Sequence, residues 1–183
     1  MRAQMKTARL LLRWLEREDA IPVQAGCNNW NVARMLAVVP YPYPDGHAQE
    51  WIAGHADQRA SGQGSPYAIT LEGELIGVVG IDNQKSGDFE LGYWIGEPYW
   101  GKGFATEAAQ AAVTIGFADL GADRLTSGHY EENPASGNVL KKCGFEYSGK
   151  SKRPCLARGE DMPSIDLTMP RTRWIDGLVA RKA

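Results

Sequence analysis

The stretch that decides the fold is Trp100-Gly101-Lys102-Gly103-Phe104-Ala105-Thr106-Glu107-Ala108. It joins a strand-like run, Phe89 to Gly96, to a long alanine-rich helical run, Ala105 to Leu120. A strand that ends in a glycine-rich turn and opens into a helix exposes backbone N–H groups without partners, at the positive end of the helix dipole. Glycine also lets a backbone approach an anion closely. The stretch therefore predicts a site for a phosphorylated ligand.

Two common nucleotide-binding motifs do not fit this turn. Lys102 is followed by Gly103 rather than by the hydroxyl residue of the nucleoside-triphosphatase loop, and Thr106 stands where the dinucleotide fingerprint needs its third glycine. Taken alone, a glycine turn before a helix can also be an ordinary tight turn. The flanking sequence has to identify the ligand.

Composition narrows the class of protein. The chain has 183 residues and a formal charge of −2, which suits one domain and offers no overall basic surface for nucleic acid. Its three cysteines and three histidines are scattered and form no C-x-x-C pair, so we expect neither a disulfide framework nor a metal site. The sequence shows no apolar run of membrane-spanning length and no signal-peptide pattern. We expect a cytoplasmic protein without a membrane or nucleic-acid partner.

Hydrophobic periodicity predicts one α+β domain over residues 1–170 and a C-terminal tail without clear period over 171–183. Trp30 and Trp51 are expected in the core, and Gly92 and Gly96 predict a bulge or a close backbone approach in their strand. The expected helices are 19–26, 30–38, 48–59 (capped by Asp45), 105–120 and 134–143. The expected strands are 8–13, 67–71, 75–81, 89–96, 124–130, 145–151 and 165–169, with turns at 72–74 and 83–87.

Two segments in order resemble the motifs of the GNAT superfamily of N-acetyltransferases. Gly92-Tyr93-Trp94-Ile95 followed by the glycine turn resembles the acyl-CoA motif [QR]-x-x-G-x-[GA], with Trp100 in place of its opening Gln or Arg. Asn133-Pro134-Ala135-Ser136-Gly137-Asn138-Val139-Leu140-Lys141-Lys142-Cys143-Gly144-Phe145 resembles the second motif, N-x-x-S-x-x-V-L-x-K-x-G-F. Thr7-Ala8-Arg9-Leu10-Leu11-Leu12-Arg13 is similar to the first strand of the Rim-type branch, the ribosomal-protein N-terminal acetyltransferases. The resemblance extends to about Met169.

The resemblance implies a three-layer α/β/α domain with a mixed, centrally splayed seven-stranded sheet. It also implies an enzyme that uses acetyl-CoA as co-substrate, without a metal, and moves the acetyl group to a primary amine. The acceptor would be a protein N-terminus or a small-molecule amine. Carried onto this chain, the residues that bind the co-substrate are Tyr93, Trp94, Ile95, Gly101, Lys102, Gly103, Phe104, Ala105, Thr106, Asn133 and Ser136.

Acetyl transfer to an amine needs a neutral nucleophile, a stabilised oxyanion and a proton for the leaving thiolate. An α-amine titrates near ~8 and a lysine near ~10.4, so a base has to remove a proton at neutral pH. A backbone N–H near Ile95 is the expected oxyanion donor. The tyrosine that often protonates the thiolate in the family is replaced by Leu140, and Ser136 is the substitute we expect. Ser136 could equally be a first-turn hydroxyl that bonds backbone.

The base is open between two residues. Rim-type enzymes tend to carry a glutamate five residues before the conserved Asn, and this position is Gly128 here. Its neighbour His129 is one candidate, because histidine titrates near neutral pH. Glu90, at the start of the strand that leads into the splay, is the other. A structural histidine and a solvated turn carboxylate are the competing interpretations. Glu107 is expected to serve the first turn of its helix.

Three further points stay open at this stage. Because the family's tyrosine and glutamate are both missing, the chain could be a non-catalytic module that senses acetyl-CoA. The loop Pro40-Tyr41-Pro42-Tyr43-Pro44 could be a rigid connector or a wall of the acceptor pocket. The residues after Met169 could dock on a second copy of the chain and form a homodimer.

Overall fold

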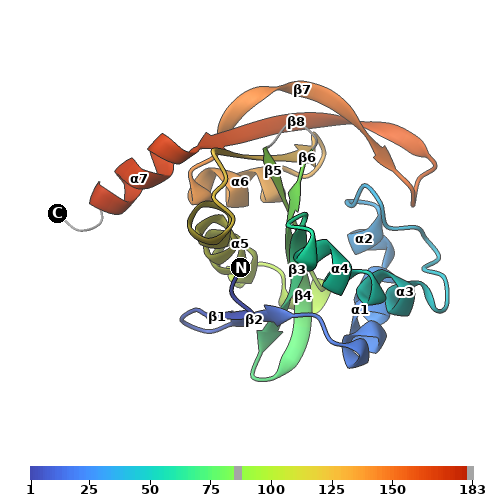
Figure 1. Cartoon of the computed structure of the whole chain (residues 1–183). Coiled ribbons are helices and arrows are strands. Elements are labelled where there is room, and N and C mark those ends of the chain that lie inside the picture. The colour runs from blue at the N-terminus through green and yellow to red at the C-terminus, as the bar shows by residue number, and fades with distance from the viewer. Residues whose placement is uncertain (85–87, 181–183) are drawn as a thin grey trace.

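The sheet runs through the whole molecule (Figure 1). The computed structural model describes residues 1–84 and 88–180, and these form an eight-stranded mixed sheet with strand order β1-β2-β3-β4-β5-β6-β8-β7. Neighbouring strands are antiparallel except β5 and β6, which are parallel. The strands are β1 (Gln4–Lys6), β2 (Leu11–Trp14), β3 (Gly64–Leu71), β4 (Glu74–Asn83), β5 (Phe89–Ile95), β6 (Arg124–Tyr130), β7 (Glu146–Cys155) and β8 (Glu160–Pro170).

The sheet opens between β5 and β6. These parallel strands pair only at Phe89–Leu125 and Glu90–Thr126 and then diverge. On its other edge, β5 pairs with β4 in continuous register from Gly77–Ile95 to Asn83–Phe89. The bulge expected from the glycines of β5 is therefore wrong, because the ladder absorbs Gly92 opposite Gly80 without a shift. The centrally splayed sheet is confirmed.

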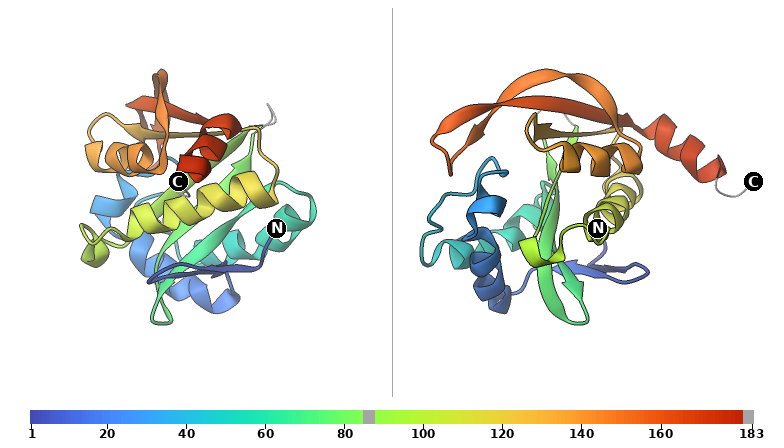
Figure 2. Two further views of the ribbon diagram at one scale, coloured as in Figure 1. Left: turned by 90° about the vertical axis from the view of Figure 1, so that its left-hand side faces the viewer. Right: turned by 180° about the vertical axis from the view of Figure 1, so that it is seen from behind.

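Helices cover both faces of the sheet (Figure 2). Helices α5 and α6 lie on one face, and the N-terminal helices α1 to α4 lie on the other, which confirms the three-layer arrangement. The helices are α1 (Ala20–Cys27), α2 (Trp30–Ala33), α3 (His47–Ala53), α4 (His55–Ala60), α5 (Phe104–Thr114), α6 (Pro134–Cys143) and α7 (Arg171–Ala180). Short 3-10 turns lie at Arg17–Asp19 and Glu97–Tyr99, and α5 continues as a π-helical turn, Ile115–Asp119.

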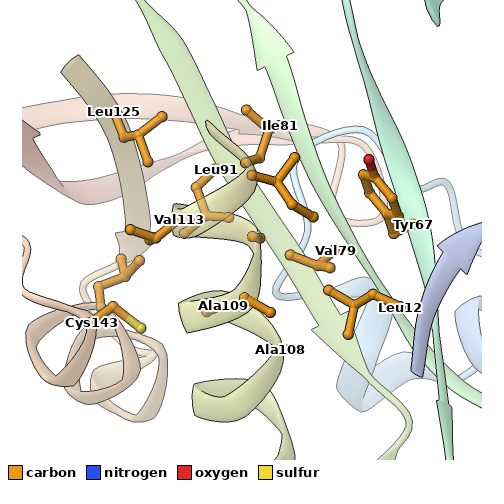
Figure 3. Packing of buried hydrophobic residues seen from close by; sticks show 14 of the residues in the cluster. Leu12, Tyr67, Val79, Ile81, Leu91, Ala108, Ala109, Val113, Leu125 and Cys143 are labelled. Carbon is orange, nitrogen blue, oxygen red and sulfur yellow. The ribbon is translucent and has the colours of Figure 1, made fainter. Parts of the chain in front are cut away.

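Two hydrophobic cores result, one on each face. The larger core joins the sheet to α5, where the sheet residues Val79, Ile81 and Leu91 meet the helix residues Ala108, Ala109 and Val113 (Figure 3). Small alanine side chains let the helix lie close to the strands. The smaller core joins α1 and α3 to the opposite face and includes Val23, Ile52 and Val78.

Several boundaries differ from the sequence-based prediction. The first strand became a hairpin of β1 and β2, which accounts for eight strands instead of seven. Helix 30–38 is shortened to α2, helix 48–59 is divided at Gly54, and Gly46 instead of Asp45 caps α3. The tail contains α7, which projects from the body (Figure 1). Residues 85–87 of the expected turn and 181–183 of the tail lie outside the described residues.

The two tryptophans expected in the core are partly exposed. Trp30 packs edge-to-face on Tyr41 of the proline loop, and Trp51 packs in the same way on His55. Both therefore use one edge of the ring for packing and leave the other to solvent, as amphipathic aromatic side chains often do.

Candidate functional site

The glycine turn has the geometry of an anion site. Gly101 and Gly103 both adopt positive φ, 75° and 83°, where residues with a Cβ are strained. Gly103 caps α5, and the first helical bond runs from the N–H of Glu107 to the Gly103 carbonyl at 3.1 Å. The N–H groups of residues 104–106 precede that bond and point out of the helix end. This orphaned set fits a pyrophosphate, as the sequence predicts.

The hairpin of β1 and β2 braces this turn. Arg9 donates from Nε to Oε2 of Glu107 at 2.7 Å and from Nη1 to the Lys102 carbonyl at 3.0 Å. Burial alone would raise the pKa of Glu107, but hydrogen bonds from Thr7 and Arg9 hold it below its usual value. The Lys102 amine donates back to the Pro98 carbonyl at 3.0 Å. The turn therefore keeps its shape through contacts that leave its N–H groups open.

The β5 edge that faces the opening is the second part of the site. Gly96 N–H donates to the Ile76 carbonyl at 2.8 Å, so the antiparallel alternation directs the Trp94 backbone to β4 and the Tyr93 and Ile95 N–H groups into the opening. The Ile95 carbonyl accepts from the Trp100 indole at 2.6 Å. The Trp94 side chain packs on Gly26 of α1. Trp100 thus fixes the end of the strand where the family motif has Gln or Arg.

Helix α6 closes the opening from the other side. The Asn133 side-chain carbonyl accepts from Ser136 N–H at 3.2 Å and caps the helix. The Ser136 hydroxyl lies 2.8 Å from the Tyr93 hydroxyl, and the Tyr93 hydroxyl also donates to the Ser136 carbonyl at 3.1 Å. Burial raises the pKa of the Tyr93 phenol, and the Ser136 hydrogen bond opposes that shift. Ser136 and Tyr93 therefore form a neutral hydroxyl pair at the mouth of the opening.

Glu90 is held by an arginine that the sequence analysis did not single out. Arg153 of β7 donates to Glu90 Oε1 and, from Nη2, to Asp166 Oδ1 at 3.0 Å. Its guanidinium lies over Gly128, where an added Cβ would come within 2.7 Å of Cζ. The position of the missing family glutamate is thus filled by an arginine from another strand.

His129 lies on the α6 side of its strand. Its Nδ1 is 2.8 Å from the Tyr130 carbonyl, and its ring packs on Gly137, where an added Cβ would be 2.5 Å from Nε2. His129 and Glu90 therefore project to opposite faces of the sheet, and only the opening between β5 and β6 connects them.

A cavity of about 690 Å³ links these groups. It is lined on the α6 side by Ser136 and Asn133, at the splay by Tyr93, and on the α1–α4 side by Tyr43, Trp51 and His55. Tyr43 of the proline loop thus lies in the wall of the cavity. A Cβ added to Gly92 meets no described atom within 4 Å, so the floor of the cavity is open there.

Two residues of this cavity were missed by the sequence analysis. Asp82 follows directly after the buried strand residue Ile81, which is a signal that could have found it. Arg153 lies in a polar strand without any such pattern, and only the pairing of β7 with β8 brings it to Gly128. Within residues 1–84 and 88–180, no cluster of three metal-ligating side chains is found, and no helix there is long and apolar enough to cross a membrane.

The comparisons with known proteins agree with this geometry. Residues 9–146 match the model of the acetyltransferase (GNAT) domain. The chain is 32% identical over 150 residues to the uncharacterized N-acetyltransferase p20 of Bacillus licheniformis, covering 78% of this chain and 82% of that one. It is 31% identical over 122 residues to the [ribosomal protein uS5]-alanine N-acetyltransferase of Escherichia coli, covering 63% of each chain.

Solved structures show the same fold. A RimL ribosomal L7/L12 α-N-protein acetyltransferase in complex with coenzyme A superposes with a TM-score of 0.81 at 18% identity, covering 91% of this chain and 97% of that one. The microcin C7 self-immunity acetyltransferase MccE, in complex with acetyl-CoA and AMP, gives a TM-score of 0.79 at 17% identity, covering 93% and 97%. The resemblance, the fold class and the co-substrate expected from the sequence are confirmed. The hypothesis that the chain is a non-catalytic module is rejected. The chain belongs to the GNAT family as an acetyl-CoA-dependent N-acetyltransferase.

Proposed function

We propose that this enzyme acetylates the α-amine of a protein or peptide N-terminus. The observation that carries the proposal is the cavity that crosses the sheet at the splay, from the Tyr93 amide and Ser136 to the α1–α4 side. An extended, narrow acceptor such as a chain terminus can enter from that side and present its amine at the splay. The relative from Escherichia coli is named for an N-terminal alanine of a ribosomal protein, which supports the same acceptor class.

For the co-substrate, we propose the residues expected from the sequence, with their roles divided by geometry. The pyrophosphate binds at the N–H groups of Gly101, Lys102, Gly103, Phe104, Ala105 and Thr106, and the pantetheine arm pairs with the Tyr93 and Ile95 edge of β5. Trp94 contributes by its side chain, which closes the floor on the α1 side. Asn133 contributes by holding the first turn of α6, on which Ser136 lies.

For the chemistry, one N–H group of this edge, at Tyr93 or Ile95, supplies oxyanion stabilisation while the other pairs with the pantetheine arm, because both point into the opening and are fixed by the β4 ladder. Ser136, hydrogen-bonded to Tyr93, supplies the proton for the thiolate. The sequence offered Glu90 and His129 as candidates for the base. Glu90 lies on the acceptor side and is paired with Arg153, whereas His129 lies on the α6 side.

The test is a panel of acceptors with release of free CoA thiol as the readout. Hexapeptides that begin with alanine, serine, glycine or methionine are compared with the same peptides carrying a blocked N-terminus, with lysine side-chain peptides and with small amines. We expect CoA release only with free N-termini and a mass increase on the terminal residue. Turnover confined to lysine side chains or small amines would contradict the proposal.

A small-molecule amine is the second candidate, and one observation favours it. The turn between β7 and β8 reaches across to the loop after α2, where Leu156 N–H donates to the Ala37 carbonyl at 3.1 Å and Arg158 Nε to the Arg34 carbonyl at 3.3 Å. Arg34 and Ala37 line the cavity, so this bridge holds part of the cavity wall in place, which suits an acceptor of limited size. The same panel separates the two acceptors.

Cellular place and assembly complete the proposal. We propose that the enzyme lies in the cytoplasm, because its three cysteines are free buried thiols, as a reducing compartment maintains.

We also propose a homodimer through α7, where Ile175 and Val179 are exposed on a projecting helix. Sedimentation of the full chain and of a chain ending at residue 170 tests this: both running as monomers would contradict it.

A further inference from the structure

The acceptor-side floor of the cavity is built from three cross-strand pairs of β4 and β5. Asp82 lies opposite Glu90, Gly80 opposite Gly92, and Val78 opposite Trp94. Side chains alternate along a strand, so these residues share one face, and Val79, Ile81 and Leu91 point into the α5 core instead (Figure 3). The two glycines leave the floor hollow between an apolar end at Trp94 and a carboxylate end at Asp82 and Glu90.

The two carboxylates at this end are not equivalent. Glu90 is paired with Arg153, which also binds Asp166 and is packed on Gly128. Asp82 lines the cavity, and within the described residues its carboxylate has no hydrogen bond or ion pair. Arg153 therefore neutralises the Glu90 carboxylate, whereas the Asp82 carboxylate has no such partner among the described residues and can bind a cation in the cavity.

The surroundings of Asp82 tune it for proton transfer. Its side chain is exposed to solvent in the open cavity, yet desolvation by the surrounding protein, together with the nearby Glu90 carboxylate, raises its pKa to about 6. Charged groups on the neighbouring elements have partners of their own: Arg153 pairs with Glu90, and Arg59 of α4 stacks on Trp14. On the other side, β3 sets the uncharged Gly64 opposite Asp82. A base whose pKa lies just below the pH of the reaction is mostly ionised, and it can still accept a proton from the substrate.

We propose that Asp82 is the carboxylate that receives the acceptor's ammonium group and removes its proton, an inference that rests on the acceptor class proposed above. One N–H bond of the ammonium breaks and an O–H bond forms on Asp82, which leaves a neutral amine. The amine nitrogen then forms a bond to the acetyl carbon as the carbon–sulfur bond breaks. A second proton from that nitrogen ends on the sulfur through the Ser136 and Tyr93 hydroxyls. The products are the amide, CoA thiol and a proton that Asp82 returns to solvent.

The kinetic test compares Asp82→Asn with Glu90→Gln and with Asp161→Asn, a matched control on the exposed end of β8. With an alanine-initiated hexapeptide at pH 7, we expect Asp82→Asn to lower kcat/KM roughly 10²-fold and Asp161→Asn to leave it unchanged. At pH 9 the α-amine is mostly neutral, so the Asp82→Asn deficit should shrink to below about tenfold. The acidic limb of the wild-type profile should bend near pH 6 and be absent in Asp82→Asn. A deficit equal at both pH values, or one seen with Glu90→Gln alone, would overturn the assignment.

A binding measurement keeps the inference separate from the acceptor proposal. On protein saturated with CoA, which cannot transfer an acetyl group, Asp82→Asn should weaken binding of the free-amine peptide at least fivefold and leave the N-acetylated peptide unaffected. If the wild type acetylates only the small amines of the panel, the peptide proposal fails and the same variant ratios are measured on those amines. Equal binding and equal kcat/KM in wild type and Asp82→Asn on every amine would overturn the role of Asp82.

Discussion

Gly103 combines a left-handed backbone with the proposed anion site. Its φ of 83° disfavours any residue with a Cβ, and an added Cβ would lie 3.4 Å from Nη2 of Arg9. The helix that starts here supplies the N–H groups, while Arg9 and Glu107 neutralise each other beside it. The local charge at the turn is therefore set by the helix end together with Lys102, whose ammonium donates to the neutral Pro98 carbonyl.

Replacing this glycine by aspartate should remove co-substrate binding. Gly103→Asp puts a carboxylate among donors meant for phosphate oxygens, and loss of two or three charge-assisted bonds corresponds to about 3 kcal/mol, or more than 100-fold in CoA affinity. Isothermal titration with CoA measures this. Gly159→Asp is the matched control, because Gly159 has a φ of 71° in an exposed turn between β7 and β8. Unchanged CoA affinity in Gly103→Asp would refute the assigned pyrophosphate site.

At the scale of elements, α6 divides its residues between the site and the core. Ser136 in the first turn faces the opening, whereas Leu140, one turn later, is fully buried between α6 and the main core. The hydroxyl that meets Ser136 comes from Tyr93 on β5, across the opening. Position 140, which is often tyrosine in the family, is therefore occupied by a core leucine here. The phenol at the site comes from Tyr93 on β5 instead.

Returning a tyrosine to position 140 should therefore destabilise the protein without improving catalysis. Leu140→Tyr adds volume and a hydroxyl to a closely packed core, which costs about 1–3 kcal/mol. Urea unfolding at pH 7 measures the loss, with Lys141→Tyr on the exposed side of α6 as control. A Leu140→Tyr protein as stable as the wild type and faster in acetyl transfer would show that the site can still use this position.

At the scale of the whole molecule, the sheet separates two cores, and the smaller one encloses a histidine. His55 of α4 is 1% exposed, and neither ring nitrogen has a partner within the described residues. Burial, with a contribution from Arg59, lowers its pKa to about 4. Because the unfolded chain binds a proton near ~6.5, the unfolded state takes up more protons between these values. Folding stability is consequently lost as pH falls through that window.

The burial of His55 predicts that this one residue lowers the folding stability of the protein in acid. Between pH 7 and pH 5, His55 should account for about 2 kcal/mol of lost stability in the wild type. His55→Phe keeps an aromatic ring against Trp51 and cannot be protonated, so its stability should fall by about 2 kcal/mol less over the same interval. Urea unfolding at the two pH values measures the difference. Equal losses in wild type and variant would contradict the predicted role, and His47→Asn is the control for a half-buried histidine that packs on Tyr43.

The local sequence was sufficient to predict the features that depend only on residues close together in the chain. The glycine turn, the helix after it and the backbone edge of β5 could be predicted, because turn conformation, helix starts and strand alternation depend on neighbours in the chain. Glu107 was correctly placed in the first helical turn, although its partners Thr7 and Arg9 lie about a hundred residues away. The same local reasoning missed the β1–β2 hairpin and α7, whose patterns are short or weakly periodic.

The acceptor side depended on the tertiary structure. Arg153 reaches Gly128 because β7 pairs with β8 and β8 with β6, a register that no local pattern encodes. Asp82 and Glu90 become a pair because β4 and β5 align them, and they differ because only one of them meets an arginine. The α+β class follows from the periodicity of the sequence alone, and the phosphate turn was predicted from its backbone conformation, whereas the family and its splayed sheet were identified by the resemblance of two motifs. The tertiary structure decided which side chains share the acceptor cavity and which carboxylate is uncommitted, because burial and charge pairing arise only when distant strands are brought together.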